Sequence, residues 1–116
     1  MEETIFSKII RKEIPAEIVF ENDIVLAFKD INPQAPVHIL IIPKITEIET
    51  IRDINPDKHT ALLGSLFEAA NKIAKDLKIS ETGFRLVLNC GPDAGQEVYH
   101  LHFHLLGGRK MNWPPG

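Results

Sequence analysis

The amino-acid sequence predicts a single domain of the α+β class, and three observations lead to this prediction. The chain has 116 residues, of which 44% are hydrophobic, enough for one core but too short a chain for a second independent domain. One stretch repeats apolar residues at three- and four-residue steps, as a long amphipathic helix does. Five shorter stretches have the composition of strands and alternate unevenly with the helical segments, which is typical of α+β folds.

The first third of the chain predicts a short helix, a hairpin and a central strand. Thr4 can cap the helix, which ends at the Ile14–Pro15 pair because proline disfavours helix at the residue before it. Segments 17–20 and 24–29 are rich in Ile, Val and Phe and flank a turn-forming cluster, so they form a hairpin. Segment 37–42 is nearly all aliphatic, as expected of a central strand.

Helical signals dominate the middle of the chain. Thr46 and Glu49 form a capping box that predicts a short helix after Pro43. The Asn55–Pro56 pair begins a longer helix, predicted over 57–79. Its apolar residues form one face: Leu62, Leu63, Leu66, Phe67, Ala70, Ile73, Ala74 and Leu77.

The last third of the chain predicts two strands, 84–88 and 98–106, joined by a loop over 89–96 that contains glycine and proline. The end of the chain, 112–116, cannot extend a helix or a strand because of its adjacent prolines. We therefore expect one domain over 1–116, with a core over 1–110 and a C-terminal tail over 111–116.

Charge and cysteine content exclude several classes of function. The net charge of −3 gives no broad basic surface of the kind that binds nucleic-acid polymers. Cys90 is the one cysteine, so the fold needs no intrachain disulfide and suits a reducing compartment. The acidic N-terminus lacks a signal-peptide pattern, and no apolar run reaches membrane-spanning length. We expect a cytoplasmic protein that binds neither nucleic acid nor membrane.

The candidate chemistry lies in segment 100–105, where histidine alternates with apolar residues. Successive side chains of a strand point to opposite faces, so three imidazoles share one face while Leu101, Phe103 and Leu105 enter the core. His38, on another predicted strand, joins them if the two strands are neighbours. The imidazoles can then converge on one small polar ligand.

Three interpretations of this cluster are open. The imidazoles can be ordinary surface or hydrogen-bonded core groups. They can bind zinc, although the outer two start ~13 Å apart on one strand while Zn–N bonds are ~2.0 Å. In the third interpretation one neutral imidazole attacks the substrate covalently, and its neighbours exchange protons with the leaving group. Backbone N–H groups of loop 91–96 and the Gln96 amide can then hold phosphate oxygens.

The segment His100-Leu101-His102-Phe103-His104-Leu105-Leu106 resembles the His-x-His-x-His-x-x motif of the histidine-triad (HIT) superfamily, in which x is apolar. The flanking stretches 95–100 and 107–109 and the ending Trp113-Pro114-Pro115-Gly116 are similar to the Hint branch of nucleotide-binding proteins, especially its bacterial members. The upstream stretches 26–38 and 42–44 resemble the same branch, so the likeness covers nearly the whole chain.

This resemblance implies a HIT-like fold: a five-stranded, mainly antiparallel sheet with one long and one or two short helices, forming a ten-stranded sheet across a homodimer. It implies hydrolysis of purine nucleoside 5'-phosphoramidates through a nucleotidyl-histidine, with AMP, GMP and adenosine phosphoramidates as ligands and no cofactor or metal. His102 is then the nucleophile and His104 lies by the phosphate oxygens and the departing group. His100 and His38 support them as a relay.

The resemblance also implies a set of nucleotide-binding residues: Asp30 on the ribose hydroxyls, Asn89 and Gln96 near the phosphate, Glu97 and Val98 beside it, Phe6, Ile9, Phe28 and Ile31 around the base, and Trp113 near the partner subunit's site. Alternatively, Asp30 caps a turn and the four apolar residues only pack the core. At the position of Glu97, many eukaryotic members have a serine that donates a hydrogen bond near the leaving group. An ionised carboxylate cannot donate that bond, so the role of Glu97 is open.

Several residues are left outside the predicted site, and several functions remain open. Arg109 and Lys110 are interpreted as a solvated edge, and Cys90 as a passive loop thiol. The alternative functions are a dinucleoside polyphosphate hydrolase, a nucleotide- or partner-binding module with vestigial hydrolysis, and a metal site. His104 argues against the transferase branch of the superfamily, which usually has glutamine there.

Overall fold

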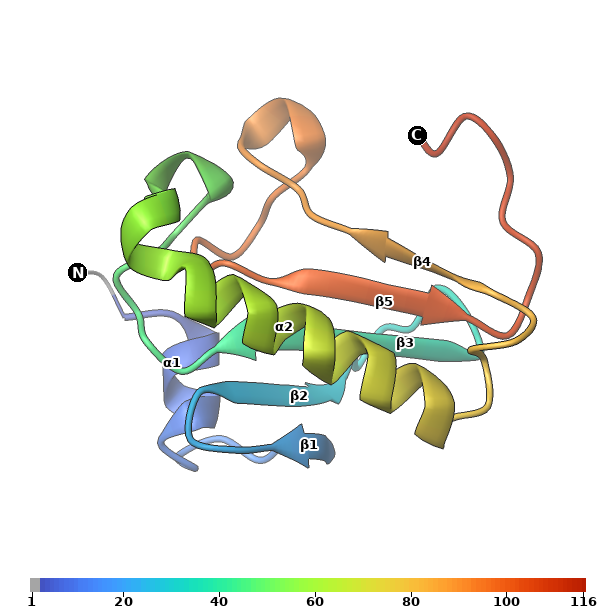
Figure 1. The fold of residues 1–116 in the computed structure, drawn as a ribbon, viewed down its shortest axis with the longest axis horizontal. Coiled ribbons are helices and arrows are strands. Elements are labelled where there is room, and N and C mark those ends of the chain that lie inside the picture. Colours follow the sequence, from blue (N-terminus) through green and yellow to red (C-terminus); the bar gives the residue numbers. More distant parts are fainter. Residues whose placement is uncertain (1–2) are drawn as a thin grey trace.

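The computed structural model describes residues 3–116, so the first two residues of the predicted domain lie outside it. Five strands form one antiparallel sheet in the order β1-β2-β3-β5-β4 (Figure 1). They are β1 (Ile18–Glu21), β2 (Val25–Lys29), β3 (Val37–Pro43), β4 (Phe84–Val87) and β5 (Phe103–Gly107). The predicted α+β class and the five-stranded sheet are confirmed.

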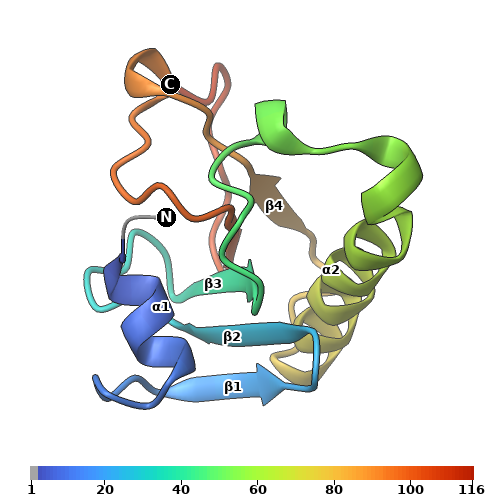
Figure 2. The ribbon, with the colours of Figure 1, turned by 90° about the vertical axis from the view of Figure 1, so that its left-hand side faces the viewer.

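Two helices cover the two faces of this sheet. The short helix α1 (Ile5–Ile10) lies on one face and the long helix α2 (Pro56–Asp76) on the other (Figure 2). Two single turns of 3-10 helix, Ile51–Asp53 and Pro92–Ala94, interrupt the connections. The face under α1 is only partly covered, and this leaves room for a site.

Strand alternation divides the apolar residues between two cores. On β2 and β3, the odd-numbered Val25, Ala27, Ile39 and Ile41 pack with α2 in the larger core. The even-numbered residues of the same strands pack with Phe6 and Ile9 of α1 in a smaller core: Leu26, Phe28, Leu40 and Ile42. β3 is the central strand, as predicted, and is buried on both faces.

The residues predicted to cap helices and form turns do so in the structure. The Thr4 hydroxyl accepts from the Ser7 backbone N–H, and this caps α1. The Asn22 side chain accepts from the backbone N–H groups of Ile24 and Val25 in the β1–β2 turn. Asn55 caps α2, with Pro56 as the first helical residue.

Two predicted helix ends and one predicted helix are wrong. Helix α1 ends at Ile10, well before Ile14–Pro15, because Lys12 adopts a left-handed φ of 63°. The predicted helix at Thr46 is absent, because a second capping box, from Thr50 to Asp53, forms the helical turn at Ile51–Asp53 instead. Helix α2 ends at Asp76 rather than at residue 79.

The last strand is shorter than predicted, because β5 begins at Phe103 and not at residue 98. Its partner β3 ends at Pro43, and the Leu101 N–H donates to Ile48 O at 2.9 Å, outside the sheet. The alternation of side chains nevertheless persists: Leu101, Phe103 and Leu105 enter the larger core. Histidines 100, 102 and 104 therefore face the α1 side, although the first two precede the strand.

Within residues 3–116, no helix has the length and apolar character needed to cross a membrane.

Candidate active site

A cavity of about 580 Å³ opens on the α1 side of the sheet. Apolar residues of α1, β2 and β3 form part of its wall, including Phe6, Ile9, Phe28 and Leu40. Its polar wall comes from the loops after β2 and β4, from the approach to β5, and from β3 and β5 themselves: Asp30, Asn89, Glu97, His102, His38 and His104. The combination of an apolar wall with a few convergent polar groups is typical of a small-molecule site.

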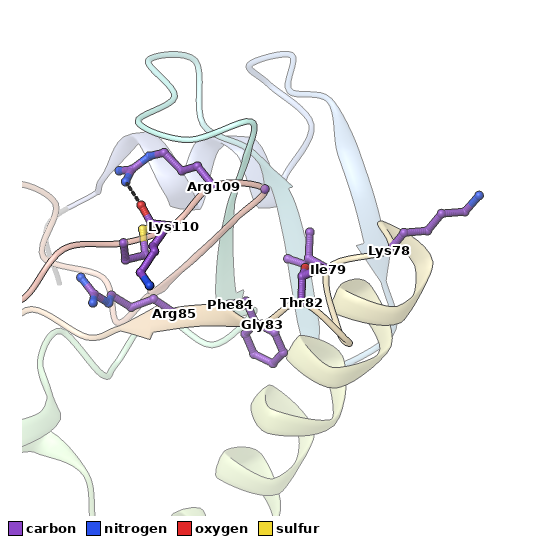
Figure 3. A pocket seen from close by; sticks show the side chains of 10 residues that line it. Lys78, Ile79, Thr82, Gly83, Phe84, Arg85, Arg109 and Lys110 are labelled. Carbon is purple, nitrogen blue, oxygen red and sulfur yellow. Dashed lines mark hydrogen bonds between the residues drawn. The ribbon is translucent and has the colours of Figure 1, made fainter.

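A larger cavity, of about 770 Å³, lies at the other end of β5, between the segment after α2 and the segment after β5 (Figure 3). It is lined by Lys78, Arg85, Arg109 and Lys110 together with apolar and uncharged residues, and by no histidine or carboxylate. It therefore offers no imidazole or carboxylate for acid–base chemistry, and the smaller cavity is the candidate active site.

His102 has the bonding pattern of an imidazole nucleophile. It is buried and lines the smaller cavity, and its Nδ1 lies 2.7 Å from His100 O. A carbonyl oxygen can only accept a hydrogen bond, so Nδ1 carries the proton of the neutral ring. Nε2 then keeps its lone pair, which is the state required for attack on an electrophile.

His38 and His104 form a pair whose protons are also fixed by their partners. The backbone N–H of Gln34 donates to His38 Nδ1 at 3.0 Å, so the proton of neutral His38 is on Nε2. His38 Nε2 lies 2.9 Å from His104 Nδ1, which therefore accepts. The proton of neutral His104 is then on Nε2, and this residue lines the cavity beside His102, 5.1 Å between ring centroids.

His100 lies behind the cavity rather than in its wall. Its side chain is almost fully buried, and Nε2 donates to Pro43 O at 2.8 Å. Its own carbonyl accepts the proton of His102, and its ring packs 6.0 Å from the Phe6 ring. His100 therefore positions the backbone that fixes the tautomer of His102.

Burial keeps the four imidazoles neutral near neutral pH. Desolvation lowers the pKa of His38, His100 and His102 below the ordinary value. For His104, desolvation acts together with the neighbouring His102 and His38 and lowers the pKa to about 4. The charge of Asp30 acts in the opposite direction on His38, His102 and His104.

Asp30 follows β2 and touches the histidine pair. Its Oδ2 lies 3.4 Å from His38 Nε2, and its Oδ1 accepts from the Asn32 N–H at 2.8 Å. The second bond is the turn cap that the sequence left as an alternative. The carboxylate thus caps the turn and also lines the cavity.

Asp30, His38 and His104 each have a ligand atom within 4.8 Å of the other two, which is close enough to consider a metal. Two nitrogen ligands of tetrahedral zinc lie ~3.3 Å apart when both Zn–N bonds are ~2.0 Å. The 2.9 Å separation of the two ring nitrogens is that of a hydrogen bond. The two rings are therefore placed as hydrogen-bond partners in this structure.

The structure brings most of the other predicted residues to this cavity. Phe6, Ile9 and Phe28 line it and also pack the smaller core. Ile31 lines it at the rim, with 97% of its surface exposed. Further residues in the wall are Asn89, Glu97 and Val98, and sequence reasoning missed Leu40, Ile14 and Gln34.

Besides His100, two predicted residues do not lie in this wall. The buried Gln96 amide donates to Glu49 O and Val98 O, and its Oε1 accepts from the Gly91 N–H at 2.9 Å. We therefore correct its predicted role: Gln96 shapes the loop and has no group free for phosphate. Trp113 is 83% exposed and lies outside the cavity of its own chain.

These imidazoles, arranged on the open face of an α+β sheet, define the class of histidine-triad proteins. The comparison with known families agrees, because the HIT domain matches residues 11–111. The chain belongs to the HIT domain family.

Relatives within the family are similar over nearly the whole chain. A purine nucleoside phosphoramidase of Escherichia coli K12 is 56% identical over 95% of this chain and 91% of its own length. An Arabidopsis thaliana protein named adenylylsulfatase HINT1 is 55% identical over 97% of this chain and 76% of its own. The crystal structure of a HIT family hydrolase from Legionella pneumophila is 54% identical, with a TM-score of 0.94, and covers 98% of this chain and 100% of that one.

Proposed function

We propose that this chain hydrolyses purine nucleoside 5'-phosphoramidates by double displacement at His102. The observation that carries the proposal is the bond from His102 Nδ1 to His100 O, which leaves Nε2 unprotonated beside the cavity. The similarity to a purine nucleoside phosphoramidase supports the substrate class. The adenylylsulfatase relative indicates that the leaving group varies within the family.

In the first step, His102 Nε2 attacks phosphorus and the P–N bond breaks. Neutral His104, protonated on Nε2, donates a hydrogen bond to the phosphoryl oxygens, and the leaving amine takes a proton from water, which leaves hydroxide. The nucleotide is then bonded to His102 Nε2, and His104 is still neutral.

In the second step, hydroxide bonds to phosphorus and the P–Nε2 bond breaks. This releases a nucleoside monophosphate and restores neutral His102, while His104 stays neutral. Water and phosphoramidate thus give amine and nucleotide with no external reductant, oxidant or cofactor. By donating to His104 Nδ1 across 2.9 Å, His38 keeps the His104 proton on Nε2, where it can reach the phosphate.

We infer the binding of the rest of the nucleotide from the position of the cavity walls. Asp30 accepts from the ribose hydroxyls, and the base lies against Phe6, Ile9, Phe28 and Ile31. Asn89 lies beside the phosphate, with Glu97 and Val98 completing that wall. Because Glu97, on the phosphate side, is exposed, the amine side of the substrate faces solvent and is only loosely specified.

We further propose a homodimer through α2 and the edge strand β4, with residues 111–116 reaching the partner's site and a domain that spans 1–116. Support comes from apolar residues exposed on these two elements: Phe67 is 50% exposed and Phe84 is 36% exposed. β4 lies at one end of the strand order, with β5 as its one neighbour in the sheet of residues 3–116. A cytoplasmic location is consistent with Cys90 being the one cysteine.

The test of the chemistry is His102→Asn, compared with His59→Asn as a matched control outside the cavity. His102→Asn should lower kcat for an adenosine phosphoramidate by at least about 10³-fold and leave AMP binding within a few-fold. After rapid quench, the intact mass of the wild type and of His59→Asn should include a nucleotidyl adduct that His102→Asn lacks. Retained turnover or a retained adduct in His102→Asn would remove it from the nucleophile's role.

A further inference from the structure

The loop over residues 30–36, between β2 and β3, determines the proton position of the histidine pair through its backbone. The Gln34 N–H donates to His38 Nδ1 at 3.0 Å, which keeps the His38 proton on Nε2 and so directs it to His104. A backbone donor cannot change its protonation, but it can move if the loop moves. The proton position of His38 therefore depends on the contacts that hold Gln34 in place.

Arg109, just after β5, holds the same residue, Gln34, through its carbonyl oxygen. Its Nε and Nη2 donate to Gln34 O at 3.2 and 3.0 Å, across 75 positions of sequence. A charged guanidinium with two donors on one carbonyl restricts that carbonyl more than a single neutral bond does. The sequence predicts that Arg109 belongs to a solvated edge. The contact with Gln34 could not be predicted, because the two residues lie far apart in the chain.

A glycine next to Arg109 allows this close approach. A side chain at Gly108 would start 2.8 Å from Pro36 Cβ, and Gly108 has a φ of +90°, which favours glycine. The segment after β5 therefore packs directly on the loop. Figure 3 shows Arg109 on this segment, with its guanidinium also bonded to Lys110 O.

We propose that Arg109 is a positioning residue for the phosphoramidase reaction: by fixing Gln34 it holds His38, and through His38 it holds the tautomer of His104. This inference rests on the proposed function for its kinetic consequence, but its structural consequence is independent of it. Without Arg109, Gln34 N–H leaves His38 Nδ1, and the ring is free to place its proton there. His104 then loses the donor on its Nδ1.

The test compares Arg109→Ala with Arg85→Ala. Arg85 is a matched control, because it also lines the larger cavity and donates to a backbone carbonyl, Asn112 O, which is not connected to the histidines. Both variants remove one positive charge, so a difference between them reflects the contact with Gln34. Thermal unfolding establishes first that both variants fold.

Two measurements decide the proposal. Long-range 1H–15N NMR of the imidazoles should detect protonated Nδ1 of His38 in Arg109→Ala only. With an adenosine phosphoramidate, Arg109→Ala should lower kcat about fivefold, the effect of one lost hydrogen bond, with KM within twofold of wild type. Arg85→Ala should match the wild type in both.

The proposal is overturned if His38 keeps its tautomer in Arg109→Ala, if Arg85→Ala changes it equally, or if the tautomer changes while kcat does not. If the wild type turns over no phosphoramidate at all, the proposed function fails by itself. The tautomer comparison still decides in that case whether Arg109 controls His38.

Discussion

At the scale of single residues, the site depends on which ring nitrogen carries a proton. Three of the four imidazoles of the cluster are oriented by a backbone carbonyl or N–H: His38 by Gln34, His100 by Pro43 and His102 by His100. His104 is the exception, because its Nδ1 is bonded to His38. Backbone partners keep their donor or acceptor character at any pH, so the neutral tautomers are fixed by the fold.

The low pKa of His104 predicts a pH-dependent stability. In the unfolded chain its pKa returns to about 6.5, whereas in the folded protein burial and its neighbours hold it at about 4. Between these values the unfolded state binds more protons, so the free energy of unfolding falls as pH drops from about 6.5 to about 4. The loss is on the order of 2 kcal/mol after allowance for the partial exposure of the ring, and stability from this source is constant at higher pH.

Urea denaturation across this pH range measures the effect, with His104→Gln as the comparison. The amide does not titrate, so its free energy of unfolding should fall less between pH 6.5 and pH 4 than that of the wild type. An equally steep fall in both proteins would contradict the assignment to His104.

A chelator experiment separates proton transfer from metal catalysis. Because the His38 and His104 nitrogens are 2.9 Å apart, as in a hydrogen bond, we expect phosphoramidase turnover to be unchanged by excess chelator. Elemental analysis of the purified protein accompanies the kinetic assay. Loss of activity on stripping, restored by zinc, would favour a metal site at Asp30, His38 and His104.

At the scale of elements, helix α1 is the part of the cavity wall that depends most on local signals. It has six residues, too few to be stable alone, and its capping box joins Thr4 and Ser7 through three hydrogen bonds. It carries Phe6 and Ile9 to the cavity. Its stability therefore contributes more directly to ligand binding than that of α2.

Thr4→Ala should test this link between helix capping and binding. Loss of the cap costs about 1 kcal/mol of helix stability. Because α1 then unfolds locally more often, we expect AMP binding to weaken about threefold or more. Thr50→Ala is the control, since it removes the corresponding cap from the turn at Ile51–Asp53, which does not line the cavity. Calorimetric titration with AMP should show weakened binding in Thr4→Ala alone; equal affinities in the two variants would refute the link.

Most elements could be predicted from sequence because their signals are local. Thr4, Asn22 and Asn55 act through neighbouring backbone groups, and the periodicity of α2 reports its own buried face. The predicted start of the last strand at residue 98 is wrong, because the length of this strand depends on Pro43 and Ile48, which lie far away in sequence. The histidine cluster was found because alternation needs only extended backbone, whereas the roles of Gln96 and Arg109 depend on partners that sequence spacing does not indicate.

At the scale of the whole molecule, the sheet presents one face to α2 and another to the cavity. The larger core holds the buried residues of α2, such as Leu66 and Ile73, against β3 and β5. Exposed Phe67, whose ring lies 5.5 Å from that of Phe103, marks the place where this core reaches the surface. An exposed aromatic group on a long helix is what a subunit interface would cover.

The proposed homodimer can be tested by light scattering after size exclusion. The wild type should give twice the 13.1 kDa mass of the chain, and Phe67→Glu should give a single chain. Ile24→Glu is the matched control: Ile24 is 44% exposed and lies in the β1–β2 turn, which is not part of the proposed interface of α2 and β4. Circular dichroism checks that both variants fold. A monomeric wild type, or equal masses for the two variants, would refute an interface at Phe67.

The division of the sheet into two faces makes this scaffold suitable for redesign. Odd-numbered positions of β2 and β3 maintain the fold with α2, and even-numbered positions, together with α1, shape the cavity. Substitutions at Leu40 or Phe28 can therefore alter which ligand is accepted while the larger core keeps its packing. A protein engineer can diversify the ligand-facing side as a separate library, and screen it for stability as well, because Phe28 and Leu40 also pack the smaller core.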